Sequence, residues 1–307
     1  MTFPEPVHDI VQALLDSYHQ VGGINHVDET RLPSMESIDN LLSDLKSLVF
    51  PGFYKTLQVV DEATLPYATA EHLFRAAKGL MREIQRAIWY SHCKESPHHW
   101  GAEVQEQART VAFDLLKAIP NIRRQIQEDV QAILDGDPAA QSAAEVILAY
   151  PGVEAILVYR LAHLLYEAQV PLIPRMMSEI IHRKTGIDIH PGAQIGRRFY
   201  IDHGTGIVIG ETCIIGDEVK LYQGVTLGAL AVRKNEQAKK RHPTIEDRVT
   251  IYAGATILGG ETVIGKHSTV GGNCWITASV PPYSIIQNRP QEPIIMPRDA
   301  LIIDYQI

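Results

Sequence analysis

The sequence predicts an α+β protein in which an α-helical domain precedes a left-handed parallel β-helix of hexapeptide repeats with one extruded loop. Aliphatic residues recur every six positions between Ile187 and Tyr283, a period that no α-helix produces. Glycine keeps the same spacing, which is typical of tight corners between short strands. Three hexapeptides form one triangular coil, and stacked coils bury their aliphatic side chains in a narrow core. Before this stretch, the apolar spacing is helical.

The repeat can be followed as ladders of aliphatic residues spaced by six. The first ladder contains Ile189, Ile195, Ile201, Ile207, Cys213, Val219 and Val225. The second, two residues further on, contains Ile209, Ile215, Leu221 and Leu227. After an interruption the pattern resumes with Ile245, Ile251, Ile257 and Val263, and then, one residue later, with Ile264, Val270 and Ile276. We therefore predict a β-helix over residues 185–284 and a C-terminal tail over 285–307.

One residue breaks the second ladder. Six positions before Ile209 stands His203, so an imidazole is expected where the repeat predicts an aliphatic core residue. With about eighteen residues per coil, Asp188 would lie one coil below His203, and strands about 4.8 Å apart would bring its carboxylate within reach of the ring. An Asp that orients a His is typical of enzymes that remove a proton from their substrate. A structural, hydrogen-bonded histidine is the alternative.

A polar and basic run interrupts the repeat between Gly228 and Ile245. Such a run cannot fill the core of a β-helix, so we expect it to leave the coils as a loop. Arg241 and His242 stand where the chain returns, and their side chains would be held more firmly than those of the loop. A guanidinium at this place suits a carboxylate ligand, which it can bind with two hydrogen bonds.

These motifs in combination resemble serine O-acetyltransferase, a family of hexapeptide-repeat acyltransferases. The resemblance covers residues 129–307 and is closest to the longer bacterial forms, because residues 1–100 form an extra N-terminal segment. It departs from the family at Gly228-Ala229-Leu230-Ala231, where a Gly-Gly-Thr-Gly entry to the loop is usual. The matching runs are Asp188-Ile189-His190-Pro191, Asp202-His203 with the following Gly204–Glu211, Val225-Thr226-Leu227-Gly228, and Arg241-His242-Pro243.

The resemblance implies transfer of acetyl from acetyl-CoA to the hydroxyl of L-serine, which gives O-acetylserine and CoA for cysteine biosynthesis. His203 would be the general base and Asp188 would orient it. Two carboxylates suit the ammonium group of serine, and Arg and His suit its carboxylate. By resemblance, serine would therefore be bound by Asp202, by Asp137 in a helical Asp-Pro step, and by Arg241 and His242.

Other expectations follow from the same resemblance. No metal is expected, and only small residues let the thin pantetheine arm of CoA approach the backbone, as at Gly228, Ala229, Ala253 and Gly254. The family forms homotrimers with active sites between subunits, and pairs of trimers can join through the helical domains. Ile307 ends the chain as it does in members that insert this residue into the active site of O-acetylserine sulfhydrylase. A tail that ends in Ile by chance is the alternative.

Residues 1–184 are predicted to form the α-helical domain. Pro120 is expected to divide one helix over 111–119 from another over 122–134. Residues 152–168 are apolar on too broad a face for a surface helix, which favours a contact between subunits. A helix over 173–184 is placed to cover the exposed end of the β-helix, where unpaired strand edges need protection.

Three other functions are alternatives. The same fold acetylates sugars and other hydroxylated acceptors, and a purely structural or partner-binding role is also open. The metal-dependent carbonic anhydrase of this fold needs three converging imidazoles, and this chain lacks the paired His spacing of that family. The histidines available for such a site are His190, His203, His242 and His267.

Composition narrows the partners and the compartment. The net charge of -8 argues against a nucleic-acid-binding surface. No apolar run approaches the roughly 18 residues that span a bilayer, and the amino terminus lacks a basic and apolar signal, so a cytoplasmic protein without a membrane partner is expected. Three cysteines without metal spacing are predicted to be reduced thiols: Cys93, Cys213 and Cys274.

Overall fold

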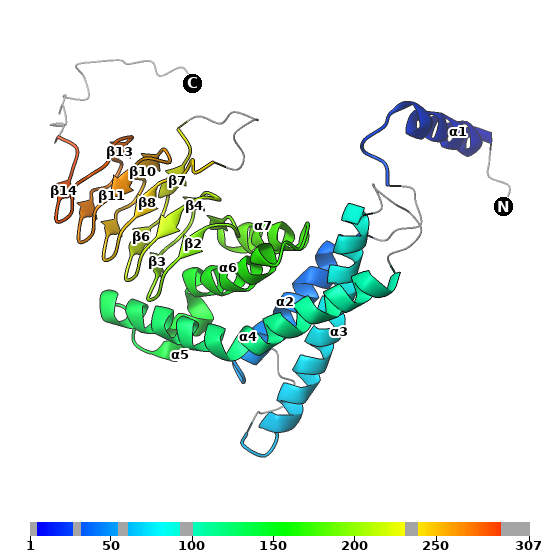
Figure 1. Ribbon diagram of the computed structural model, residues 1–307, viewed down its shortest axis with the longest axis horizontal. Helices are drawn as coiled ribbons and strands as arrows, with labels where there is room; N and C mark the ends of the chain where they lie inside the picture. The colour runs from blue at the N-terminus through cyan, green and yellow to red at the C-terminus, as the bar shows by residue number, and fades with distance from the viewer. Residues whose placement is uncertain (1–4, 27–31, 55–60, 93–100, 231–238, 290–307) are drawn as a thin grey trace, which may run out of the picture.

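The computed structural model describes residues 5–26, 32–54, 61–92, 101–230 and 239–289. Helices make up the first part of the chain and short parallel strands the rest, as Figure 1 shows. The predicted fold class, a helical region followed by a parallel β-helix, is confirmed. The last helix ends at Thr185, and the first strand begins at Asp188.

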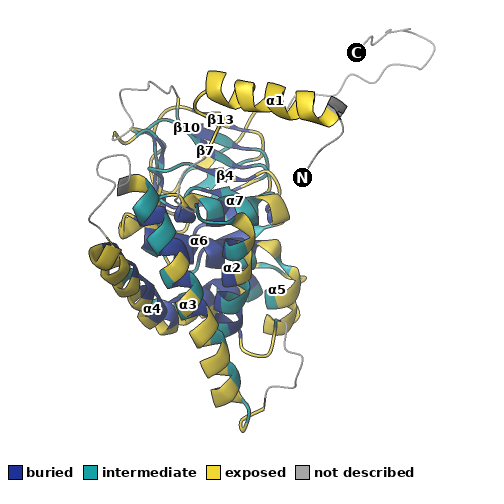
Figure 2. Cartoon of the chain, turned by 90° about the vertical axis from the view of Figure 1, so that its right-hand side faces the viewer, coloured by how far each residue is buried: buried dark blue, intermediate teal, exposed yellow. Residues whose placement is uncertain are grey.

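The helical part packs against the first coil of the β-helix. Ser34 begins the second helix and Ser142 the fifth, and each serine oxygen accepts a hydrogen bond from the backbone N–H three residues later. The first helix is exposed along residues 7–20 (Figure 2). The described helices are α1 (Glu5–Gln20), α2 (Met35–Val49), α3 (Leu65–His92), α4 (Gly101–Gly136), α5 (Ala143–Ala149), α6 (Pro151–Glu167) and α7 (Ile173–Thr185).

α4 is one continuous helix through Pro120, so the predicted division at this proline is wrong. A proline inside a helix removes one backbone hydrogen bond and costs about 3 kcal/mol. Apolar side chains are buried on both sides of Pro120, mainly against α3 and α6, and this packing outweighs the cost. The buried apolar side chains are Val104, Ala108, Ala112, Leu115, Leu116, Ile119, Ile122, Ile126, Val130 and Ile133.

α6 is the central helix of the helical part, packed between α4 and α7 (Figure 2). Its broad apolar face is buried within its own chain, so the predicted subunit contact along residues 152–168 is wrong. No single described helix is long and apolar enough to cross a membrane, and α5 with α6 meets that test only as a pair bent by 74°. Side chains fully or almost fully buried on α6 include Val153, Ile156, Leu157, Leu161 and Leu165.

The β-helix consists of three parallel sheets, which form the faces of a triangular prism. Figure 1 shows its strands stacked coil upon coil. Sheet A contains β1 (Asp188–Ile189), β4 (Val208–Ile209), β7 (Thr226–Gly228), β10 (Thr256–Leu258) and β13 (Trp275–Ile276). Sheet B contains β2 (Gln194–Ile195), β5 (Ile214–Ile215), β8 (Thr244–Ile245) and β11 (Val263–Ile264). Sheet C contains β3 (Tyr200–Asp202), β6 (Lys220–Tyr222), β9 (Thr250–Ile251), β12 (Thr269–Val270) and β14 (Ile285–Ile286).

The core of the prism is a stack of aliphatic side chains. Each strand of sheet A contributes one inward side chain, and the parallel register places these directly above one another. Burying an aliphatic side chain of this size stabilises the fold by about 1.5–3 kcal/mol. The stacked and buried residues of sheet A are Ile189, Ile209, Leu227, Ile257 and Ile276.

The first coil is longer than the one above it. Asp188 pairs with Val208, whereas Val208 pairs with Thr226, so two additional residues lie in the first coil. They fall after Asp202, the last residue of β3, and before β4. Counting back by six from Ile209 therefore leaves the core ladder before it reaches residue 203.

A buried ion pair joins the helical part to the first coil. Arg160 of α6 donates from Nε and Nη2 to the two carboxylate oxygens of Asp129 of α4, at 2.9 and 3.0 Å. The same guanidinium donates to the carbonyl of Gly196 at 2.9 Å, and the N–H of Phe199 donates to Asp129 at 2.9 Å. α7 packs against β1 at the end of the prism, where the sequence predicts a covering helix.

Candidate active site

The residues predicted to bind the acceptor, together with His203, lie at or beside two of the three corners of the prism. The His203 corner comprises residues 203–207, where the chain turns from sheet C into sheet A. The Arg241 corner comprises residues 210–213 and 239–243, where the chain turns from sheet A into sheet B. These corners lie on opposite edges of sheet A, so one chain does not bring both groups of side chains together.

His203 lies on the surface, with 69 % of its side chain exposed. The prediction that its imidazole occupies a core position is wrong, because the two extra residues of the first coil carry it out of the ladder and onto the corner. Its Nε2 lies 3.8 Å from Oδ1 of Asp202, whose side chain is only 14 % exposed. An accessible imidazole beside a well-packed carboxylate can exchange a proton with a bound ligand.

Asp137 approaches the same corner from the helical part. It follows the end of α4 and lies in the turn before α5, not within a helix as the resemblance implies. Its Oδ2 accepts a hydrogen bond from the hydroxyl of Tyr150 at 2.7 Å, and its Oδ1 accepts one from the N–H of Ala139 at 2.8 Å. These bonds, with a smaller contribution from the positive charge of Lys220, keep the pKa of Asp137 below its ordinary value.

Two aromatic residues and a lysine complete the His203 corner, and sequence reasoning missed all three. The Lys220 ammonium donates to the carbonyl of Gly136 at 3.0 Å and lies 4.3 Å from the ring centroid of Tyr200. The hydrogen bond to Asp137 raises the pKa of Tyr150 to about 12, so its hydroxyl remains a donor at neutral pH. Tyr200 and Lys220 are paired in the strand register, and only a correct coil length would reveal them as neighbours.

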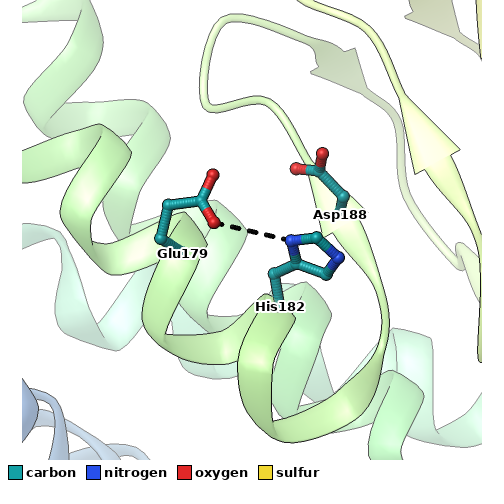
Figure 3. Close-up of side chains that lie close together, drawn as sticks. All are labelled: Glu179, His182 and Asp188. Carbon is teal, nitrogen blue, oxygen red and sulfur yellow. Dashed lines mark ion pairs between the residues drawn. The ribbon is translucent and has the colours of Figure 1, made fainter.

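Asp188 lies in β1 and faces Glu179 and His182 of α7 (Figure 3). Its Oδ1 is buried without a hydrogen-bond partner, and Nη1 of Arg175 lies 3.7 Å from this oxygen. Within the part of the chain that the structure describes, no hydrogen bond or ion pair joins Asp188 to His203. The catalytic pairing of these two residues therefore stays a prediction.

The cluster around Asp188 also has the ligand types of a cation site. Glu179, His182 and Asp188 each place one ligand atom within 4.8 Å of the others, and Nδ1 of His182 lies 3.5 Å from Glu179. Arg175 forms an ion pair with each of the two carboxylates. Its positive charge compensates the negative charge that would attract a cation, so we assign no metal to this cluster.

The Arg241 corner holds its two predicted residues through Thr212. The hydroxyl oxygen of Thr212 accepts hydrogen bonds from the N–H groups of Arg241 and His242, at 2.9 and 3.0 Å. Nδ1 of His242 in turn accepts one from the N–H of Thr212 at 3.0 Å. Burial, helped by the positive charge of Arg241, lowers the pKa of His242 to about 4, so this imidazole is neutral at physiological pH.

Glu211 connects the Arg241 corner to the helical part. Its Oε2 accepts a hydrogen bond from the Arg241 guanidinium, and its Oε1 accepts one of 2.7 Å from the hydroxyl of Tyr166 on α6. His190 meets the Tyr166 ring edge-on, with 5.7 Å between centroids. Glu211 belongs to a run that carries the family resemblance, but its link to Tyr166 becomes visible only when α6 is packed against the prism.

The four residues expected near CoA are divided in the same way. Gly228 ends β7 and Ala229 follows it, on the edge of sheet A that leads to the loop. Ala253 and Gly254 lie between β9 and β10, where sheet C turns into sheet A. Gly254 has a φ of +70°, and a Cβ there would lie 2.3 Å from Oδ1 of Asn273, so the backbone is open at this position only with glycine.

The histidines considered for a carbonic anhydrase site are spread over all three corners. His190 and His242 lie near the Arg241 corner, and His203 lies at its own corner. His267 lies between sheets B and C, where it stacks on Tyr283 with 4.9 Å between ring centroids. The four imidazoles do not converge within one chain, which argues against this alternative.

Comparison with known proteins places the chain in a family. A family model described as serine acetyltransferase, N-terminal, matches residues 81–180. The plasmid serine acetyltransferase of Synechococcus elongatus is 46 % identical over 261 residues, which cover 83 % of this chain and 81 % of the relative.

Solved structures agree with this relationship. Serine acetyltransferase isoform 3 from Entamoeba histolytica, in complex with cysteine, matches with a TM-score of 0.69 and 32 % identity over 94 % of each chain. Soybean serine acetyltransferase complexed with serine matches with a TM-score of 0.53 and 26 % identity, over 83 % of this chain and 98 % of that one. The motifs read from the sequence and these comparisons lead to one conclusion, that the chain belongs to the serine acetyltransferase family.

Proposed function

We propose that the protein transfers the acetyl group of acetyl-CoA to the hydroxyl of L-serine, which gives O-acetylserine and CoA for cysteine biosynthesis. The observation that carries this proposal is the gathering of Asp137, Asp202 and His203 at one corner of the prism. Two carboxylates there suit an ammonium group, and the exposed imidazole beside them suits a hydroxyl that must lose its proton. Acetyl-CoA is the acetyl donor used by the family.

Serine would be recognised by groups from both corners. Asp137 and Asp202 would bind the ammonium group, while Arg241 and the neutral ring of His242 would bind the carboxylate. The hydrogen bonds from Tyr150 and Ala139 support this role of Asp137, because they keep its carboxylate ionised and fix its orientation. Recognition of both charged groups would then place the serine hydroxyl against His203.

In the proposed reaction, His203 removes the proton from the serine hydroxyl as the oxygen attacks the thioester carbon of acetyl-CoA. The carbon–sulfur bond then breaks, and the imidazolium returns its proton to the CoA thiolate. Asp188 is proposed to orient the imidazole of His203 by binding the ring nitrogen that does not take the proton from serine. The backbone near Gly228, Ala229, Ala253 and Gly254 is proposed to bind the pantetheine arm.

A homotrimer would complete the site. The two groups of site residues lie on opposite edges of sheet A, which supports an arrangement in which the His203 corner of one subunit meets the Arg241 corner of the next. Mixing His203→Ala with Arg241→Met would test this at a serine concentration far below the KM of Arg241→Met, where only interfaces with both native residues would contribute appreciable activity. Random assembly predicts recovery of about a quarter of wild-type activity, and no recovery in verified mixed trimers would contradict the arrangement.

The acceptor is tested by thiol release from acetyl-CoA, with serine, homoserine and a hydroxylated sugar offered side by side. Serine should be acetylated with the highest kcat/KM, because only the amino acids present both charged groups and serine has the shorter hydroxyl arm. A preference for the sugar would replace this proposal with the alternative of a sugar acetyltransferase. If thiol is released with none of the three acceptors, both the serine acetyltransferase and the sugar acetyltransferase proposals are excluded.

The C-terminal isoleucine is proposed to dock into O-acetylserine sulfhydrylase. Ile307 lies outside the described residues, so this proposal rests on the sequence resemblance alone. An apolar side chain beside a free carboxylate suits a pocket built to bind an amino acid. Removal of Ile307 should abolish co-elution with the sulfhydrylase, and unchanged co-elution would exclude this contact.

A further inference from the structure

Glu211 is bound from both sides by residues that come from different parts of the fold. Arg241, which follows the loop, donates to its Oε2, and Tyr166, from α6, donates to its Oε1 at 2.7 Å. Glu211 itself lies in the turn between β4 and β5, within the rigid stack of coils. A single carboxylate therefore ties the base of the loop to both the prism and the helical part.

An arginine at the base of a loop needs such support before it can bind a ligand well. A long arginine side chain loses about 1.5–2 kcal/mol of rotamer entropy when it is fixed. If it is already fixed in the free protein, that cost does not reduce the affinity for the ligand. A guanidinium has five N–H donors, so one carboxylate can hold it while it binds a second.

The charges of the three groups are consistent with this support at neutral pH. Burial and the hydrogen bond to Glu211 raise the pKa of Tyr166 to about 12, so its hydroxyl is present to donate. Burial alone would raise the pKa of Glu211, but the hydrogen bonds from Tyr166 and Arg241 outweigh it and lower the pKa. The result is a chain in which a neutral hydroxyl, a carboxylate and a guanidinium are each hydrogen-bonded to the next.

Neighbouring residues restrict the movement of the hydrogen-bonded side chains of Tyr166, Glu211 and Arg241. The backbone N–H of Arg241 is bound to Thr212, the residue after Glu211. His190 packs against the Tyr166 ring, and a Cβ at Gly192 would lie 2.9 Å from Cζ of the same ring. These contacts support the Tyr166 ring on the side of His190 and Gly192, while 38 % of the residue is exposed.

We infer that Glu211, held by Tyr166, is a positioning residue that fixes Arg241 for the α-carboxylate of the acceptor. This inference rests on the proposed function. It assigns roles to a glutamate and to a tyrosine that lies outside the prism, and it makes recognition of the acceptor carboxylate depend on how α6 packs against the coils. Neither residue touches the reacting atoms.

The plain alternative is that Tyr166 and Glu211 only fasten α6 to the prism. The two readings differ in a measurable way. A positioning role affects the KM for serine and acts only through Arg241, whereas a fastening role affects stability and adds to any change at Arg241.

The test compares Glu211→Gln and Tyr166→Phe with the wild-type enzyme, using thiol release at varied serine. Each variant should raise the KM for serine about tenfold, a size expected for the loss of one hydrogen bond to a charged group. The values of kcat and of the KM for acetyl-CoA should stay within about twofold. An unchanged KM for serine in a folded Tyr166→Phe variant would overturn the inference.

The double variant Glu211→Gln with Arg241→Met gives the decisive comparison. If Glu211 acts through Arg241, the double variant should have the same kcat/KM for serine as Arg241→Met alone. A further tenfold loss in the double variant would show that Glu211 has a separate role. Tyr159→Phe is the matched control. Tyr159 lies on α6, as Tyr166 does, and its hydroxyl donates a hydrogen bond to the carbonyl of Ala193 at 2.6 Å. That variant should lower the unfolding temperature without raising the KM for serine.

These outcomes are distinct from failure of the proposed function. If the wild-type enzyme releases no thiol with serine, the proposed function fails. If the wild-type enzyme acetylates serine and the two variants match it, the function stands and the positioning role is wrong.

Discussion

Asp202 and His203 are adjacent in sequence and 3.8 Å apart at Oδ1 and Nε2, yet the first side chain is largely buried and the second largely exposed. Asp202 is the last residue of β3, and His203 is the first residue of the corner that makes the first coil longer. The end of β3 thus presents an accessible imidazole next to a carboxylate, and the proposed role of His203 as the general base rests on this arrangement.

Replacement of His203 by Ala should abolish most turnover and leave the fold intact. A general base contributes about 10²–10⁴ to the rate, so kcat should fall by a factor in that range. The unfolding temperature should change little, because the side chain is exposed and fills no core position. Thiol release and a thermal melt measure the two effects, and turnover near the wild-type level would remove His203 from the mechanism.

Replacement of Asp129 by Ala should destabilise the protein strongly. The change leaves the buried guanidinium of Arg160 without its carboxylate, and breaking a buried ion pair costs about 3–5 kcal/mol. The matched control is Glu128→Ala, whose partner Arg197 is 65 % exposed, and this should cost no more than about 1 kcal/mol. Urea unfolding gives both values, and equal losses would contradict the importance assigned to the buried pair.

Replacement of Gly210 by Ala should disturb the Arg241 corner. A Cβ at Gly210 would lie 2.0 Å from Cδ2 of His242, so the ring must move and its bonds with Thr212 would be strained. We expect a loss of about 1–3 kcal/mol in the free energy of unfolding and a raised KM for serine.

The control for this glycine is Gly79→Ala in α3. A Cβ there would lie at an ordinary 3.5 Å from Leu41, and alanine favours a helix over glycine by about 1 kcal/mol. Gly79→Ala should therefore leave the free energy of unfolding unchanged or raise it, and it should not change the KM for serine. A Gly210→Ala variant that melts and binds serine like the wild-type protein would show that the His242 ring has more freedom than this packing allows.

His242 should make stability depend on pH in mildly acidic solution. Its folded pKa of about 4 lies below its ordinary value of 6.5, so between these values the unfolded chain binds a proton that the folded chain does not. Stability is therefore complete above about pH 6.5 and is lost as the pH falls toward 4. The slope of unfolding free energy against pH should be smaller in His242→Asn, and an unchanged slope would assign the effect to other groups.

A six-residue period has one structural explanation, so the aliphatic core of a β-helix was predictable. Ile189 and Ile209 stack on each other in the structure, although counting by six places them in two different ladders. The placement of His203 was not predictable, because the repeat does not reveal that the corner after Asp202 holds two more residues than the same corner of the next coil. Counting by six holds across corners of regular length and fails across a corner that contains extra residues. Pro120 was misjudged for a related reason, since local rules do not include the packing on both sides of α4.

The sequence resemblance names the candidate site residues, but it does not name the side chains that hold them in place. Asp137 and Tyr150 meet through a turn whose path depends on how α4 and α5 pack. Glu211 and Tyr166 are 45 positions apart and belong to different kinds of structure. Such pairs have no periodic signal, because each is created by the contact between the helical part and the prism.

The bonds from Arg160 to Gly196 and from Phe199 to Asp129 also bear on how the molecule is assembled. A ribosome releases the chain from its amino end, so the long helices emerge before any coil does. Every later strand finds a ready hydrogen-bonding edge on the coil beneath it, but the first coil has no coil below. We therefore expect the helices to serve as its template and the β-helix to grow toward the carboxyl end.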